Sequence, residues 1–170
     1  DAAVLTLFGT GHQAGYEAQA IARIRTLSRI LVVGRDPSRA TAFATMLQGQ
    51  GLPAEVADPE PAVRAADIIV TATTATAPLF DADWVQPGTH ISSMGSDAQG
   101  KQELPPTLFP RARLFCDLPA QSARIGEFQH ATPATPLTAI GAVLSGASEG
   151  RQSLKDITVF DSSGISLQDL

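Results

Sequence analysis

The chain has 170 residues, of which 44% are hydrophobic and 17% charged, a composition typical of one globular domain with a single core. A formal net charge of -5 and the lack of any lysine- or arginine-rich run argue against nucleic acid or an anionic membrane surface as a partner. The single cysteine, Cys116, excludes an internal disulfide framework. We therefore expect a cytoplasmic protein without a membrane-spanning segment that handles a small molecule.

Strand-like and helix-like segments alternate along the chain. Runs of β-branched and apolar residues predict strands at 4–8, 30–33, 54–56, 68–71, 90–93, 114–117 and 158–161. Apolar spacing and capping signals predict helices at 14–25, 38–50 and 61–65. This alternation predicts an α/β fold with a doubly wound, mostly parallel Rossmann sheet and helices on both faces. Because the first predicted strand begins almost at residue 1 and residues 166–170 resemble the start of a helix, we expect residues 1–170 to be a single domain cut from a longer subunit.

The first predicted strand runs directly into a Gly-x-Gly-x-x-Ala turn at 9–14, which opens the first predicted helix. Gly9 permits the tight turn, Gly11 has no Cβ to obstruct a phosphate, and Ala14 lets the helix pack closely on the strand. The free N–H groups at the start of such a helix attract an anion. The pattern predicts a dinucleotide site, and a glycine turn in an unrelated α/β domain is the alternative. The expected cofactor contacts in this turn are Gly9, Thr10, Gly11, His12 and Gln13.

The residues after the second predicted strand bear on the choice of dinucleotide. A carboxylate at this position binds the ribose 2′-hydroxyl of NAD and repels the 2′-phosphate of NADP. Here the sequence reads Gly34-Arg35-Asp36, and Arg35 offers a planar guanidinium to a phosphate, with Arg39 close behind. NADP(H) is therefore the favoured cofactor. NAD(H) is the alternative if Asp36 points at the ribose, and Asp36 could equally serve only as the cap of the next helix.

Small and hydroxylated residues follow other predicted strands. Ligands of open α/β sheets bind outside the carboxyl ends of the strands, so we expect these residues to contact the cofactor. They are Ala72, Thr73 and Thr74 after the fourth predicted strand, Met94 and Gly95 after the fifth, and Ser163 after the last. Ordinary turns rich in serine and threonine are the alternative interpretation.

A glycine-rich loop at 92–103 follows the fifth predicted strand, near the expected position of the nicotinamide. Asp97 in this loop is a candidate for proton exchange with a substrate nitrogen while a hydride moves to or from the adjacent carbon. From the residues alone, a turn-forming aspartate is the alternative. Lys101 and Glu103 are expected to form a solvated pair or to start a helix. The three histidines are scattered, with no carboxylate spaced to complete a site, so we expect no bound metal.

Five motifs, in order along the chain, resemble the ornithine cyclodeaminase/mu-crystallin family. They are Gly-Thr-Gly-His-Gln-Ala at 9–14, Ala-Asp-Ile-Ile-Val-Thr-Ala-Thr at 66–73, Pro-Gly-Thr-His-Ile-Ser-Ser-Met-Gly-Ser-Asp at 87–97, Gly-Lys-Gln-Glu-Leu at 100–104 and Asp-Ile-Thr-Val-Phe-Asp-Ser-Ser-Gly at 156–164. The resemblance covers essentially the whole chain. It implies an NAD(P)-binding Rossmann domain inserted in a larger, homodimeric subunit, whose other domain binds the substrate and is absent here.

The family includes ornithine cyclodeaminases, reductases of cyclic imines such as pyrroline-2-carboxylate, alanine dehydrogenases, and mu-crystallins that bind NADPH. The resemblance implies that Asp97 is the catalytic proton carrier, because it matches the acid that has this role in cyclodeaminases. Arg35 is a departure, since cyclodeaminases resemble NAD enzymes with an acidic residue there. We therefore expect an NAD(P)H-dependent imine reductase or amino-acid dehydrogenase acting on a cyclic imine or small amino acid. The alternatives are an ornithine cyclodeaminase and a non-catalytic, NADPH-gated binding protein of the mu-crystallin type.

Overall fold

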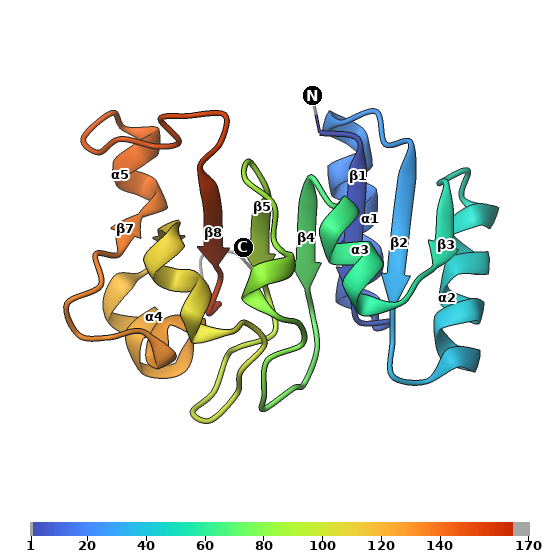
Figure 1. The fold of residues 1–170 in the computed structure, drawn as a ribbon, viewed down its shortest axis with the longest axis horizontal. Helices are drawn as coiled ribbons and strands as arrows, with labels where there is room; N and C mark the ends of the chain where they lie inside the picture. Colours follow the sequence, from blue (N-terminus) through green and yellow to red (C-terminus); the bar gives the residue numbers. More distant parts are fainter. Residues whose placement is uncertain (1, 165–170) are drawn as a thin grey trace.

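The computed structural model describes residues 2–164, so the helix expected at 166–170 lies outside the described residues. Eight strands in this range form one sheet in the order β3-β2-β1-β4-β5-β8-β6-β7, and every neighbouring pair is parallel (Figure 1). The strands are Val4–Phe8 (β1), Arg29–Val33 (β2), Ala54–Val56 (β3), Ile68–Thr71 (β4), His90–Ser93 (β5), Ala112–Cys116 (β6), Thr138–Ala139 (β7) and Ile157–Asp161 (β8). The predicted Rossmann architecture is confirmed, and all seven predicted strands are present.

Between residues 2 and 164, five α-helices and three short 3-10 helices connect these strands. The α-helices are His12–Ile24 (α1), Pro37–Gly49 (α2), Pro59–Ala65 (α3), Pro119–Ile125 (α4) and Ile140–Leu144 (α5). The 3-10 helices are Ala82–Trp84 (η1), Pro106–Arg111 (η2) and Glu127–His130 (η3). Proline stands in the first turn of α2, α3 and α4, where its missing N–H has no intrahelical partner to lose. The sequence analysis did not predict α4, α5 or β7. Of these, α5 and β7 have five and two residues and are too short to show a hydrophobic period.

The core lies on both faces of the sheet because side chains alternate along each strand. On one face, Leu5 and Leu7 of β1 pack against α1 and α2, with Phe43 of α2 among the contacts. On the other face, Phe8 of β1 packs against α3 and η1. Its ring centroid lies 5.3 Å from that of Phe80, which comes just before η1. Strands covered on both faces are apolar throughout, which is why the strand runs were readable in the sequence.

The order of the strands reverses beside β1. The chain passes from β1 to β2 and β3 in one direction, and then crosses back to β4 on the opposite side of β1. In open α/β sheets a ligand binds at such a reversal, outside the carboxyl ends of the strands. Because all strands are parallel, the carboxyl ends of β1, β2, β4, β5 and β8 lie along one edge, the lower edge in Figure 1. None of the described helices is long and apolar enough to span a bilayer.

Candidate functional site

Gly9 lies where β1 ends and cannot be replaced by a larger residue without strain. Its φ is 116°, a conformation that residues with a side chain rarely adopt. A Cβ at Gly9 would lie 2.4 Å from the carbonyl oxygen of Ala72, the first residue after β4. The amide N–H of Ala72 in turn donates to the carbonyl of Phe8 at 2.9 Å. Glycine is therefore required for the close approach of the two loops on either side of the strand reversal.

Gly11 lies open to solvent at the start of α1. A Cβ there would meet no atom within 4 Å, so packing within the described residues does not require glycine at this position. As the N-cap of α1 it has extended backbone, and neither a side-chain cap nor an acidic residue in the first turn compensates the free N–H groups. Such a helix start is suited to binding an anion, and the open space over Gly11 fits the approach of a pyrophosphate.

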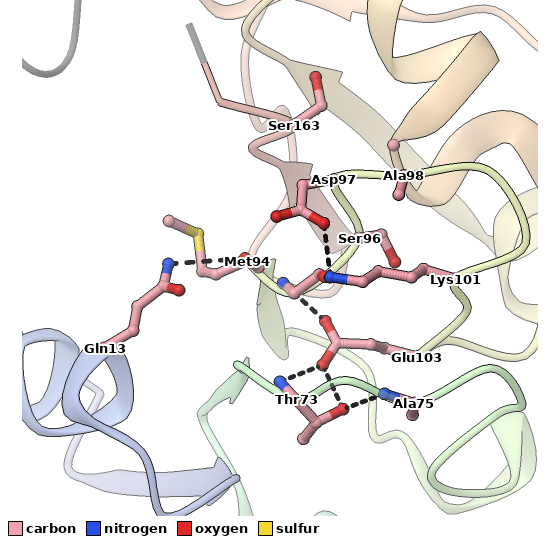
Figure 2. A network of polar contacts seen from close by, with 12 residues as sticks. Gln13, Thr73, Ala75, Met94, Ser96, Asp97, Ala98, Lys101, Glu103 and Ser163 are labelled. Carbon is pink, nitrogen blue, oxygen red and sulfur yellow. Dashed lines mark hydrogen bonds and ion pairs between the residues drawn. The ribbon is translucent and has the colours of Figure 1, made fainter.

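The other predicted contacts of this turn lie around Gly11. Thr10 is half-buried, and its Cγ2 would lie 3.1 Å from a Cβ built on Gly34 after β2. His12 is exposed in the first turn of α1. Gln13 reaches across to the end of β5, where its Nε2 donates to the carbonyl of Met94 at 3.5 Å (Figure 2). The turn therefore contacts the segments after β2, β4 and β5.

The positively charged residues expected near the ribose lie on the β2 side of this edge. Arg35 and Arg39 are exposed, and within residues 2–164 neither guanidinium makes a hydrogen bond or ion pair. Asp36 is the N-cap of α2, because its Oδ1 accepts a hydrogen bond from the Arg39 amide at 3.1 Å. Asp36 thus has the position that the capping alternative describes, and Arg35 is the unpaired guanidinium nearer to the end of β2 in the sequence.

Glu103 joins the loops that follow β4 and β5. Its side chain is completely buried, and its Oε1 accepts from the amide and hydroxyl of Thr73 at 2.7 and 2.8 Å. Its Oε2 accepts from the Gly95 amide at 2.9 Å, so one carboxylate lies between the two loops (Figure 2). The prediction of a solvated Lys101–Glu103 pair or a helix start is wrong. The available signal for a buried carboxylate was the group of hydroxyl residues at the ends of two neighbouring strands, because buried hydroxyls need a hydrogen-bond acceptor.

Asp97 projects from the loop beyond Gly95, above the buried Glu103 in Figure 2. Its carboxylate is 62% exposed and forms an ion pair with Lys101 at 2.5 Å. Lys101 also donates to the carbonyl of Gly95 at 3.2 Å, which ties this charged pair to the end of β5. An exposed carboxylate held at a fixed position can exchange protons with a substrate group and with solvent.

Ser163 lies after β8 on the same edge but is engaged elsewhere. Its hydroxyl donates to the buried Asp117 at 3.2 Å, and Gln121 of α4 donates to it at 3.2 Å. No hydrogen bond between Ser163 and Asp97 occurs among the described residues. Thr74, by contrast, is exposed immediately beyond Thr73.

Two further buried carboxylates, which the sequence analysis missed, continue from Glu103 toward β8. Glu127 accepts from the amides of Glu103 and Leu104 and, at 2.5 Å, from the hydroxyl of Ser96. Its own amide donates to Asp161 at 3.1 Å, and Ser122 donates to the other oxygen of Asp161. Burial raises the pKa of Glu127 and raises the pKa of Asp161 to about 7, with nearby negative charges adding to the effect. The carboxylates of Glu127 and Asp161 thus lie buried below the exposed loops of this edge.

A groove of about 1290 Å³ lies away from all of these residues, at the amino ends of the strands. It is lined by Ile24 at the end of α1, Val143 of α5, Arg151 and Leu154. His90 in its wall is already hydrogen-bonded to Thr158 and Ser92 through its two ring nitrogens. Among the described residues, no group of three or more His, Cys, Asp or Glu side chains is arranged so that it could hold a metal ion. The chemistry-bearing residues therefore gather at the opposite edge.

A parallel sheet with a strand reversal, an open glycine turn and an uncapped helix start at that reversal defines a Rossmann-type dinucleotide-binding domain. The model of the ornithine cyclodeaminase/mu-crystallin family matches residues 1–170, and the chain belongs to this family.

Named relatives in this family carry different activities. The iminosuccinate reductase of Paracoccus denitrificans is 37% identical over 174 residues, which cover 99% of this chain and 54% of that protein. Its structure in complex with NAD⁺ has a TM-score of 0.88 at 38% identity, covering 99% of this chain and 54% of that one. The ornithine cyclodeaminase of Agrobacterium fabrum is 34% identical over 172 residues, 99% of this chain and 49% of the relative.

An archaeal alanine dehydrogenase dimer with bound NAD has a TM-score of 0.93 at 31% identity, covering 99% of this chain and 54% of the other. The chain thus spans about half the length of the relatives that it matches. It corresponds to one portion of the longer proteins of this family, and its Rossmann-type fold is that of solved structures that contain NAD.

Proposed function

We propose that this chain is the cofactor-binding part of an NAD(P)H-dependent enzyme that reduces a cyclic imine of the pyrroline-2-carboxylate type or oxidises a small amino acid. The observation that carries the proposal is the position of Asp97. Its exposed carboxylate, fixed by Lys101, lies on the same sheet edge as the open start of α1. Relatives named as an iminosuccinate reductase, a pyrroline-2-carboxylate reductase and an alanine dehydrogenase support this class of reaction.

The residues of this edge have different roles in the proposed function. Gly9, Gly11 and the first turn of α1 bind the pyrophosphate, while Thr73 and Gly95 lie toward the nicotinamide end. When bound, NAD(P)(H) supplies or accepts the hydride. Asp97 donates a proton from its carboxyl group to the substrate nitrogen in reduction and removes it in oxidation, and Lys101 keeps the carboxylate oriented. The residues that bind the rest of the substrate belong to the part of the subunit outside this chain.

For the cofactor we propose NADP(H), because Arg35 presents an unpaired guanidinium where the ribose phosphate of NADP would lie. NAD(H) is the alternative, since the two similar structures are described with NAD or NAD⁺. We further propose that the complete subunit acts as a homodimer, as the archaeal alanine dehydrogenase does.

The complete protein tests the activity. Mixed with NADPH or NADH and pyrroline-2-carboxylate, it is expected to consume the reduced cofactor, measured by its absorbance. The cyclodeaminase alternative, supported by the Agrobacterium fabrum relative, predicts instead that ornithine alone yields ammonia without net turnover of the cofactor. That result would replace the reductase proposal. Tight NADPH binding with no turnover of any of these substrates would favour the mu-crystallin-type alternative.

A further inference from the structure

Glu103 has an unusual number of hydrogen bonds for one side chain. Within the described residues its two oxygens accept from Thr71 Oγ1 at 2.8 Å, Ser93 Oγ at 3.3 Å, and the Thr73 and Gly95 groups given above. Every one of these partners is an N–H or O–H group, and the side chain is completely buried. A buried carboxylate is stable only when its lone pairs are satisfied in this way.

The donors come from two segments that are distant in sequence. Thr71 and Thr73 belong to the end of β4 and its following loop, whereas Ser93 and Gly95 belong to the end of β5. The loops are also in direct contact, since a Cβ on Gly95 would lie 2.4 Å from the carbonyl oxygen of Thr73 and 2.6 Å from Glu103 Oε1. Glu103 therefore lies between two loops that have no room to move closer.

The main chain of Glu103 is itself fixed. Its amide donates to Glu127 at 3.0 Å, and its carbonyl accepts from Leu79 at 2.8 Å. Leu104, the next residue, is completely buried and also donates to Glu127, at 2.7 Å. The carboxylate of Glu103 is thus an anchored acceptor, and the loops take their positions from it.

We propose that Glu103 is a positioning residue for the dinucleotide site, which sets the nicotinamide-side wall formed by Thr73 and Gly95. The inference rests on the proposed function, because it assumes that a dinucleotide occupies this edge. The adenine half of the dinucleotide would contact the β1 and β2 loops, which Glu103 does not touch. Loss of this carboxylate should therefore weaken binding of the nicotinamide half selectively.

Glutamine at this position has the right shape but the wrong hydrogen-bonding groups. The Thr73 amide faces Oε1 and the Gly95 amide faces Oε2, so a side-chain NH₂ must meet a backbone N–H on one side. Hydroxyl groups can rotate to accept from an NH₂, whereas a backbone N–H can only donate. In Glu103→Gln one of the two loops loses its acceptor, while the volume of the core is unchanged.

Asp161 provides a matched control. It is a buried carboxylate on the same edge, but it accepts from Ser122 and Glu127 rather than from either loop. In Asp161→Asn the hydroxyl of Ser122 can turn to accept from the new NH₂, and the remaining oxygen still accepts from the Glu127 amide. This variant therefore makes the same chemical change without disturbing Thr73 or Gly95.

The test measures binding of two ligands to the complete protein and its variants by titration calorimetry. One ligand is the reduced dinucleotide that wild type prefers, and the other is the matching ADP-ribose, with or without its 2′-phosphate, which lacks the nicotinamide. Glu103→Gln is expected to bind the dinucleotide about tenfold more weakly, the loss of one buried hydrogen bond, with ADP-ribose affinity changed less than about twofold. Asp161→Asn should match wild type for both ligands.

Two outcomes would overturn the inference: wild-type dinucleotide affinity in Glu103→Gln, or an equal loss for both ligands, which would mean a general structural role. If wild type binds neither ligand, the proposed function fails and the inference fails with it. Thr71→Val covers the case in which Glu103→Gln does not fold, because it removes one donor to Glu103 from a completely buried site. It is expected to weaken dinucleotide binding about threefold and to leave ADP-ribose binding unchanged, and no change in the dinucleotide affinity would refute the inference.

Discussion

Lys101 Nζ lies 2.5 Å from Asp97 Oδ1, four residues away in a segment that is not helical. The same ammonium group donates to the carbonyl of Gly95, so the carboxylate has a fixed position relative to the end of β5. The pair is accessible from solvent, and a group that transfers a proton to a substrate needs both properties.

Asp97→Asn is expected to lower kcat by about 10²–10⁴-fold, because asparagine cannot carry the transferred proton. The exposed position of Asp97 predicts little change in thermal stability or dinucleotide affinity. Steady-state kinetics on the complete protein, together with a binding titration, measure both effects. Unchanged kcat would remove Asp97 from the mechanism.

Lys101→Met is expected to lower kcat about tenfold by freeing the Asp97 carboxylate from its position. The free energy of unfolding should change by less than about 1 kcal/mol, because this ion pair is partly exposed. Lys101→Arg, which keeps the charge, should recover part of the activity. A Lys101→Met variant with a clearly lower free energy of unfolding but a nearly unchanged kcat would contradict a positioning role for Lys101.

Two glycines of the first turn are expected to have different roles, Gly9 in stability and Gly11 in dinucleotide binding. Gly9→Ala is expected to lower the free energy of unfolding by at least about 1–3 kcal/mol, since alanine is strained at a φ of 116° and meets the Ala72 carbonyl. Gly11→Ala should change stability by no more than about 1 kcal/mol, because its φ is -88° and the space around it is open. Its dinucleotide affinity should nevertheless fall about tenfold or more, because the added Cβ occupies the approach of the pyrophosphate. Denaturant unfolding and dinucleotide titration of both variants measure these effects. Equal changes of stability and of dinucleotide affinity in the two variants would be evidence against the assignment of Gly11 to the pyrophosphate site.

Arg35→Ala tests the cofactor assignment. Loss of the guanidinium should weaken NADP(H) binding about tenfold and leave NAD(H) binding within about twofold, because only NADP carries the 2′-phosphate. Lys155→Ala is the charge-matched control, since Lys155 is exposed and comes directly after Leu154, which lines the groove at the opposite edge of the sheet. Equal losses for the two dinucleotides in Arg35→Ala, or the same NADP selectivity in wild type and variant, would contradict the phosphate contact.

The buried Asp161 predicts a pH dependence of stability. Its pKa is raised from 3.8 to about 7 in the folded protein, so the folded state binds the proton more tightly than the unfolded state. The stability that this group contributes is complete below about pH 4 and is lost as the pH rises toward and through 7. Relative to Asp161→Asn, wild type should lose up to about 4 kcal/mol of unfolding free energy between pH 4 and pH 8. Urea unfolding of both proteins at several pH values checks the sign, and a constant difference would show that Asp161 is ionised throughout.

The fold was predictable because its central strands are buried on both faces. Two apolar runs, Val4–Phe8 and Ile68–Thr71, indicate buried strands by their composition alone. The glycine turn marks where the first of them ends. The strand Thr138–Ala139 has two residues and no pattern of its own, so only its pairing with β6 defines it. Elements of that kind depend on tertiary contacts that no local pattern encodes.

The exposed residues of the candidate site have a clearer signal in the sequence than the buried residues that support them. Gly11, Arg35 and Asp97 were proposed because each residue type suits its local chemistry at a strand end, and their roles stay predictions. Glu103 stands in a polar stretch and looks like a surface residue, although its side chain is completely buried. Its role follows from donors in the loops after β4 and β5 that are 30 and 8 residues away, and spacing along the chain does not encode such contacts. Gly9 was interpreted as a turn former, and the structure adds its contact with Ala72.

The succession of buried acids from Glu103 through Glu127 to Asp161 has a consequence for how this domain can change over evolutionary time. The acids join the ends of β4, β5 and β8 from beneath, whereas Asp97 to Gly100 lie exposed above them. Substitutions at residues 98–100 of that outer loop can alter its exposed surface without removing a hydrogen bond of the buried acids. The outer surface of this loop can thus diverge over evolutionary time while the underlying acids stay the same.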